Sequence, residues 1–135
     1  MTVFVDTNVL VYDSIENSPH HERASVLIDE SENSIINSLS IVELGFVLPR
    51  YGIDNENVRK KIEELLHSEY FTVSWLSGKI MEKVSAFMVE NKLSFRDFND
   101  WIIAYDAHSR KVPLITFDKI LYNKCRKLGI QVNEI

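Results

Sequence analysis

The feature that most constrains the fold is the N-terminal stretch of residues 2–10, an apolar run interrupted by Asp6. Residues 3–5 are β-branched or aromatic, which is typical of a buried strand, and Asp6 follows directly. In an open α/β sheet, ligands bind at the carboxyl ends of the strands. A carboxylate buried there needs a metal ion, a basic partner or a helix N-terminus. Asp6 is therefore predicted either to serve a functional site or to cap a short helix from Thr7.

Strand and helix patterns alternate along the rest of the chain. Further strands are expected at residues 34–37, 70–75, 112–117 and 130–135. Helices between them are expected to start near Ser18-Pro19, Ser40, Asp54, Ser77 and Asp97. This alternation predicts an α/β fold: one domain over residues 1–135, built on an open, parallel, doubly wound sheet of about five strands flanked by helices.

Composition narrows the function classes. The 135 residues are 45% hydrophobic and 26% charged, which is typical of a soluble globular protein. A single cysteine, Cys125, and the lack of a signal peptide or a long apolar span favour the cytoplasm and argue against a membrane role. The net charge of −5 disfavours general adhesion to nucleic acid. Any nucleic acid is expected to be held locally or through bound cations.

Asp118 ends the predicted fourth strand as Asp6 ends the first. If these two strands are neighbours where the strand order reverses, the two carboxylates face each other over one crevice. Asp118 also fits a helix cap. Thr116, two residues earlier, points to the same side of the strand, and Thr116 and Asn8 are candidate polar supports of the site.

Two further acids stand at helix starts. Glu43 forms a Ser40-x-x-Glu43 pattern, which also fits a capping box, but a helix after the second strand begins at the sheet edge where Asp6 lies. Asp97 and Asp100 share one face of a first helical turn. Asp100 precedes the apolar turn of Trp101, so it is favoured as the site residue, with Asp97 as an outer partner.

Electrostatic repulsion between these carboxylates indicates what kind of site they form. Two carboxylates about 5 Å apart repel by roughly 3 kcal/mol at an effective dielectric of about 20. Four such groups without compensation would be hard to tolerate in a domain of about 5–15 kcal/mol stability. One or two Mg²⁺ or Mn²⁺ ions relieve the repulsion, since these ions take all-oxygen ligands, and such sites suit phosphodiester hydrolysis.

The ordered set of acidic motifs resembles the PIN-domain nucleases, and the small size is similar to VapC-type toxins. The motifs are Asp6-Thr7-Asn8, Ser40-x-x-Glu43-Leu44, Asp100-Trp101-Ile102-Ile103-Ala104 and Thr116-Phe117-Asp118. The resemblance implies an endoribonuclease that uses Mg²⁺ or Mn²⁺, with Asp6, Glu43, Asp100 and Asp118 as catalytic and metal-binding carboxylates. It also implies products with a 5′-phosphate, a homodimer and inhibition by a small antitoxin.

Three further points concern residues in or near these motifs. Asp106 lies well round the helix from Asp100 and is interpreted as surface charge. The apolar residues Phe46, Leu48 and Tyr51 fit either the core or a dimer or antitoxin surface. The third acid is Asp97 or Asp100.

Other functions remain as alternatives. A phosphatase usually has a second acid two residues after the strand-end aspartate, where this chain has Asn8, and a phospho-receiver has an acceptor aspartate after the third strand, where it has Trp75-Leu76-Ser77. A PIN-type RNA-processing nuclease that is not a toxin and a non-catalytic binding module with the PIN fold are the remaining alternatives.

Overall fold

A computed structural model describes residues 1–135, apart from the side chain of Glu134. Five parallel strands form one sheet in the order β3-β2-β1-β4-β5. They are β1 (Thr2–Val5), β2 (Asn33–Asn37), β3 (Phe71–Ser74), β4 (Leu114–Thr116) and β5 (Val132–Glu134). The predicted α/β class with an open parallel sheet is confirmed.

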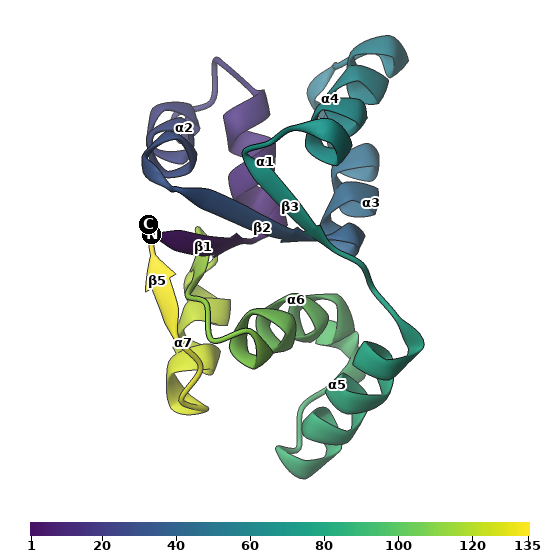
Figure 1. Cartoon of the computed structure of the whole chain (residues 1–135), viewed down its shortest axis with the longest axis vertical. Helices are drawn as coiled ribbons and strands as arrows, with labels where there is room; N and C mark the ends of the chain where they lie inside the picture. Colours follow the sequence, from purple (N-terminus) through teal and green to yellow (C-terminus); the bar gives the residue numbers. More distant parts are fainter.

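Helices cover both faces of this sheet (Figure 1). The α-helices are α1 (Thr7–Ser14), α2 (His21–Glu30), α3 (Ser38–Val47), α4 (Asn55–His67), α5 (Gly78–Glu90), α6 (Phe98–Ser109) and α7 (Lys119–Lys127). Two short 3-10 helices, η1 (Leu48–Tyr51) and η2 (Phe95–Asp97), precede α4 and α6. None of the helices in the described structure combines the length and apolar character that crossing a bilayer requires.

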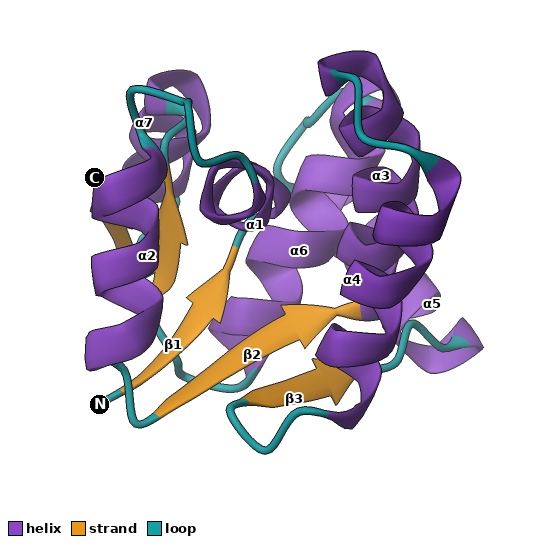
Figure 2. Ribbon diagram, turned by 90° about the horizontal axis from the view of Figure 1, so that it is seen from above, coloured by secondary structure: helices purple, strands orange, loops and turns teal.

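Alternation along the strands builds two hydrophobic cores, one on each face. Val3 and Val5 of β1 and Ile115 of β4 pack with residues of α1 to α4, whereas Phe4 and Leu114 pack with residues of α5, α6 and α7. Both faces of the central strands are thus buried, which explains why their sequences read as continuous apolar runs. Figure 2 shows β1, β2 and β3 side by side and running in one direction.

The strand order reverses at β1. The chain moves outward from β1 to β2 and β3, then returns to pair β4 with the other edge of β1, in the register Phe4 to Leu114 and Val5 to Ile115. The Asp6 amide continues this pairing by donating to the Ile115 carbonyl, at 3.1 Å. The expected adjacency of the first and fourth strands is therefore confirmed, and it places their carboxyl ends at one switch point.

Two helix starts differ from the sequence prediction. Helix α2 begins at His21, and the Ser18 hydroxyl accepts from the His20 amide in the preceding turn, so Ser18-Pro19 is not its cap. Helix α3 begins two residues before Ser40, because the Asn37 side chain accepts from the Leu39 amide and caps it.

Candidate active site

A pocket of about 260 Å³ lies where β1 and β4 end, and four carboxyl groups line it. Asp6 follows β1 and Asp118 caps the start of α7, while Glu43 comes from α3 and Asp100 from the first turn of α6. The structure thus brings together four acids that are far apart in the sequence.

Asp6 is the most buried of the four, with 6% of its surface exposed. Its Oδ1 accepts from the Thr7 amide at 2.7 Å and so caps α1, and its Oδ2 accepts from the Thr116 hydroxyl at 2.7 Å. Burial raises the pKa of Asp6 to about 7, and the charges of Asp100 and Glu43 act in the same direction, against the two hydrogen bonds. Asp6 therefore does both things that the sequence offered as alternatives: it caps α1, and it lines the pocket.

The Thr116 hydroxyl joins the two strand ends. Besides donating to Asp6, it lies 3.0 Å from the Asp118 amide and 3.3 Å from Asn8 Nδ2, both of which donate to it. The Asn8 Oδ1 in turn accepts from the Phe117 amide at 3.2 Å. These contacts hold the Asp6 carboxylate and the chain before Asp118 in one fixed relation.

Glu43 is held by Thr7 and not by its own helix. The Thr7 hydroxyl lies 2.7 Å from Glu43 Oε1 and 2.9 Å from Ser40 Oγ. Because Thr7 carries one hydroxyl hydrogen, it donates to the carboxylate and accepts from Ser40. The capping-box interpretation of Ser40 and Glu43 is wrong, since Asn37 is the cap and Ser40 turns toward α1.

Asp100 carries the second strongly shifted carboxyl group. Burial raises its pKa to about 6, and repulsion by Asp118, Glu43 and Asp97 adds to this. Lys124 works in the opposite direction. No hydrogen bond is made to the Asp100 side chain by the residues that the structure describes, so Lys124 alone offsets part of the repulsion by the other carboxylates.

Asp97 lies beside this pocket and not in its wall. Its Oδ2 pairs with Lys124 Nζ at 3.2 Å, and it lines a neighbouring hollow together with Asp100, Asp118 and Lys124. It caps α6 by position only, because its side chain makes no hydrogen bond to a backbone amide of the helix. The geometry therefore separates the two candidates for the third acid: Asp100 faces the other carboxylates, and Asp97 faces a lysine.

The donor set fits a hard divalent cation. The polar residues that line the pocket carry carboxyl, hydroxyl or amide groups, and two carboxyl pKa values are raised by burial together with mutual repulsion. Among the described side chains, no three of His, Cys, Asp or Glu are already gathered tightly enough to ligate one ion. Mg²⁺ does not require such a cage, since it is usually held by one or two carboxylates and retains several waters.

Sequence reasoning missed several residues that the structure places here. Thr7 orients Glu43, and Tyr12 and Tyr51 line the pocket. Tyr12 lies four residues after Asn8 on α1, so helical spacing alone indicated that both share one face.

Asp106 is a correction, because it is buried rather than on the surface. Only 2% of it is exposed, its Oδ2 accepts from Asn37 Nδ2 at 2.8 Å, and its Oδ1 accepts from Arg110 Nε at 3.2 Å. Phe46 and Tyr51 are 68% and 53% exposed, whereas Leu48 is core. Of the three residues, Leu48 therefore belongs to the core, and Phe46 and Tyr51 lie on the surface.

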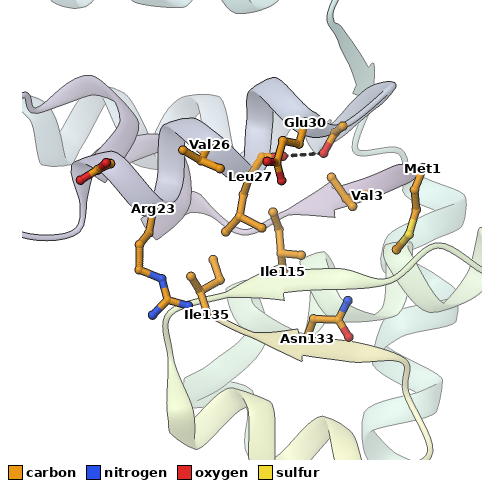
Figure 3. A pocket seen from close by; sticks show the side chains of 11 residues that line it. Met1, Val3, Arg23, Val26, Leu27, Glu30, Ile115, Asn133 and Ile135 are labelled. Atoms are coloured by element: carbon orange, nitrogen blue, oxygen red, sulfur yellow. Dashed lines mark hydrogen bonds between the residues drawn. The ribbon is translucent and has the colours of Figure 1, made fainter.

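The more apolar hollow of Figure 3 lies away from the acids. It has a volume of about 520 Å³ and opens between α2 and the strands, where Leu27 of α2 faces Ile115 and Ile135. None of the four clustered carboxylates lines it. Size alone therefore does not identify the reactive site of this protein, whereas the chemistry of the lining does.

A family model of the PIN domain matches residues 3–127. The chain belongs to the PIN domain family. The resemblance seen in the four acidic motifs is thereby confirmed. No curated protein matches the sequence significantly.

Several solved structures share this PIN fold. VapBC-1 from nontypeable Haemophilus influenzae is 24% identical with a TM-score of 0.63, and the match covers 99% of this chain and 98% of that one. VapBC2 from Rickettsia felis, solved with a promoter DNA fragment, is 18% identical with a TM-score of 0.67, covering 100% and 99%. VapC20 from Mycobacterium tuberculosis, a toxin that cleaves the sarcin-ricin loop, is 14% identical with a TM-score of 0.76, covering 90% and 94%.

Proposed function

We propose that this PIN domain is a Mg²⁺- or Mn²⁺-dependent endoribonuclease and the toxin of a toxin-antitoxin pair, acting in the cytoplasm. The single nuclease domain extends over residues 1–135. The observation that carries the proposal is the convergence of Asp6, Glu43, Asp100 and Asp118 on one pocket at the strand switch point. Crowded, partly desolvated carboxylates with raised pKa values are costly to the fold and are typical of functional sites.

One or two divalent ions would be held by Asp6, Asp100 and Asp118 with Glu43 beside them. Such an ion would supply activation of a water molecule and neutralisation of charge on the phosphate, and the products of this hydrolysis would carry a 5′-phosphate. The protein's own part is to fix the oxygens. Thr116 and Asn8 hold Asp6 against the end of β4, and Thr7 holds Glu43 from α1. Asp97 keeps the Lys124 ammonium beside the carboxylates, where it neutralises part of their charge and faces an incoming phosphate.

The predicted result of an activity test is RNA cleavage that needs both the ion and Asp6. Purified wild type and Asp6→Asn are each incubated with a labelled single-stranded RNA, in Mg²⁺ or in EDTA. Cleavage is expected only for wild type in Mg²⁺, because the substitution removes one ligand charge and disrupts the Thr116 hydrogen bond. Equal cleavage in all four reactions would indicate a contaminating nuclease and contradict the proposal.

A small antitoxin is proposed to inhibit the enzyme by covering or entering the carboxylate pocket. The proposal is supported by similar structures that are described as VapBC pairs and by a toxin-antitoxin complex from Klebsiella pneumoniae. A short neighbouring reading frame whose product binds the chain and suppresses cleavage is the expected finding. A product that binds without suppressing cleavage would contradict it.

A homodimer is proposed from the exposed apolar surface on α3 and beside it. Val42, Phe46 and Trp75 are 56%, 68% and 64% exposed, and Val42 and Trp75 line an apolar hollow of about 370 Å³. Exposed clusters of this kind mark interaction sites. Light scattering is expected to give twice the mass of 15.7 kDa for wild type and the monomer mass for Trp75→Glu. A monomeric wild type would contradict the dimer.

A further inference from the structure

Besides the four carboxylates, aromatic and apolar side chains line the pocket. Tyr12 and Val11 of α1 and Val47 and Tyr51 at the end of α3 and in η1 complete its lining. Its volume of about 260 Å³ is just below the roughly 300–1,000 Å³ range of small-molecule sites. A pocket of this size has room for one flat ring system beside the carboxylates.

The Tyr12 ring is fixed in place by two other rings. It meets Phe117 in a T-shaped contact, with centroids 5.0 Å apart and an interplanar angle of 87°, and it lies 4.8 Å from the His20 ring. His20 and Phe117 are themselves 5.0 Å apart. Because such contacts favour defined ring orientations, Tyr12 presents a pre-oriented surface to the pocket. Phe117 also stands between Thr116 and Asp118, which ties this surface to the site.

Tyr51 is the exposed counterpart of Tyr12. It closes η1, with 53% of its surface exposed, and the turn behind it is fixed by Gly52 at φ 83°, whose amide donates to the Leu48 and Pro49 carbonyls. That left-handed conformation suits glycine. Within the described part of the chain, neither the Tyr12 nor the Tyr51 hydroxyl forms a hydrogen bond. A large ring held on a stiff turn, half exposed beside acidic groups, has a surface free for a ligand.

We propose that Tyr12 and Tyr51 bind one unpaired base of the RNA by stacking, next to the phosphate that is cleaved. This inference rests on the proposed nuclease function. Every base offers a π-face, so stacking on aromatic side chains holds single-stranded RNA with little dependence on sequence. The two rings and the four carboxylates line the same pocket, which suits a nucleotide, since the faces of its base are apolar and its phosphate is charged. Bases inside a duplex are already stacked, so this site selects single-stranded or flipped-out nucleotides.

The test measures binding separately from cleavage. In the Asp100→Asn background with Mg²⁺, fluorescence anisotropy compares a labelled octauridylate with an eight-unit chain of abasic ribose phosphates. The octauridylate is expected to bind more tightly, by about five- to a hundredfold, which corresponds to the stacking of one base. Tyr51→Leu and Tyr12→Leu are each expected to reduce octauridylate binding by about the same factor and to leave the abasic chain unaffected.

Matched variants control for folding and for surface tyrosines in general. Tyr51→Phe and Tyr12→Phe keep the ring and are expected to retain octauridylate binding. Tyr70→Leu removes a tyrosine that is 74% exposed and not part of the pocket, and it is expected to change neither oligomer's binding. Tyr51 is the decisive position, because Tyr12 also packs on Phe117 and its truncation disturbs that contact.

Three results would overturn the base site. These are equal binding of the two oligomers, an equal loss on both oligomers in the leucine variants, and leucine variants that keep octauridylate affinity but lose inhibition by the antitoxin. The third result would mean that Tyr12 and Tyr51 bind a protein partner and not a base. Cleavage by wild type is measured in a separate assay. Base-dependent binding without any cleavage would contradict the proposed nuclease function but would still support the base-binding site.

Discussion

Replacing Asp100 by asparagine is expected to lower RNA cleavage by about 10²- to 10³-fold, an effect of the size seen when one preorganised electrostatic group is removed. The same change is expected to stabilise the protein when no divalent ion is present. Asp100 stands among other carboxylates, its own carboxyl group lacks a hydrogen bond from the described residues, and its pKa is raised to about 6. Neutralising it removes repulsion that the fold otherwise has to tolerate.

The direction of the pH dependence follows from the raised pKa. The Asp100 carboxyl group has a pKa of about 6 in the folded chain and 3.8 in the unfolded chain, so the folded chain binds its proton more tightly. Protonated Asp100 therefore stabilises the fold below about pH 4, and this stabilisation is lost as the pH rises through 6. Asp100→Asn is therefore expected to add about 1–2 kcal/mol to the free energy of unfolding at pH 8, after allowance for partial exposure, and little at pH 4. Urea unfolding in EDTA at both pH values measures this.

Asp97→Asn is the matched control for Asp100. It removes an acid of the same helix start, but one that is paired with Lys124 at 3.2 Å and does not line the carboxylate pocket. Cleavage is expected to fall by less than about tenfold, and stability to fall slightly with the loss of a surface pair. A destabilised Asp100→Asn that still cleaves RNA would show that Asp100 is a structural residue.

Replacing Asp106 by alanine is expected to be the most destabilising single change outside the apolar cores, at about 2–3 kcal/mol. Asp106 accepts from Asn37 Nδ2 and pairs with Arg110, whose Nη2 also donates to Ser74 Oγ at 2.9 Å. Asn37, Ser74 and Asp106 are each at most 2% exposed. Removing the carboxylate leaves a buried amide without its partner and a cation without its counter-charge, while the 41% exposure of the Arg110 side chain limits the loss.

Glu63→Ala supplies the comparison for this network. Glu63 pairs with Arg59 on α4 with both side chains more than half exposed, so its removal is expected to cost less than about 1 kcal/mol. Both variants are compared with wild type by urea unfolding. A loss from Asp106→Ala no larger than that from Glu63→Ala would show that the buried network contributes little.

The strands and their order of appearance could be predicted because local pattern and tertiary environment agree. Val3 and Val5 are β-branched and lie in a central strand buried on both faces, so composition and burial point to the same state. The placing of Asp6 and Asp118 at one switch point followed from topology rules that hold for parallel sheets in general.

The contacts of individual acids could not be predicted, because distant residues decide them. Ser40 and Glu43 match a local capping pattern, but Asn37 at the end of β2 already caps α3, and Thr7 from α1 holds Glu43. The spacing of Ser40 and Glu43 does not indicate that α1 packs beside them.

Asp106 shows the same problem in a helix. Its angle from Asp100 predicted an exposed face, but α6 is buried on more than one side, with Trp101, Ile103 and Ala107 each at most 1% exposed. Because other elements pack against several sides of this helix, a carboxylate on it is buried whichever of these sides it lies on. The dense apolar run of Trp101 to Ala104 was the signal that a charged residue just after it needed a partner.

The central claim is that the clustered carboxylates form a site for a divalent ion. Electron paramagnetic resonance of free Mn²⁺, titrated with wild type, Asp100→Asn and Asp97→Asn, tests it without any RNA. The account predicts saturable binding of one or two ions by wild type, an affinity about 10- to 100-fold weaker in Asp100→Asn, and near-wild-type binding in Asp97→Asn. Absence of Mn²⁺ binding by wild type, or undiminished binding by Asp100→Asn, would contradict it.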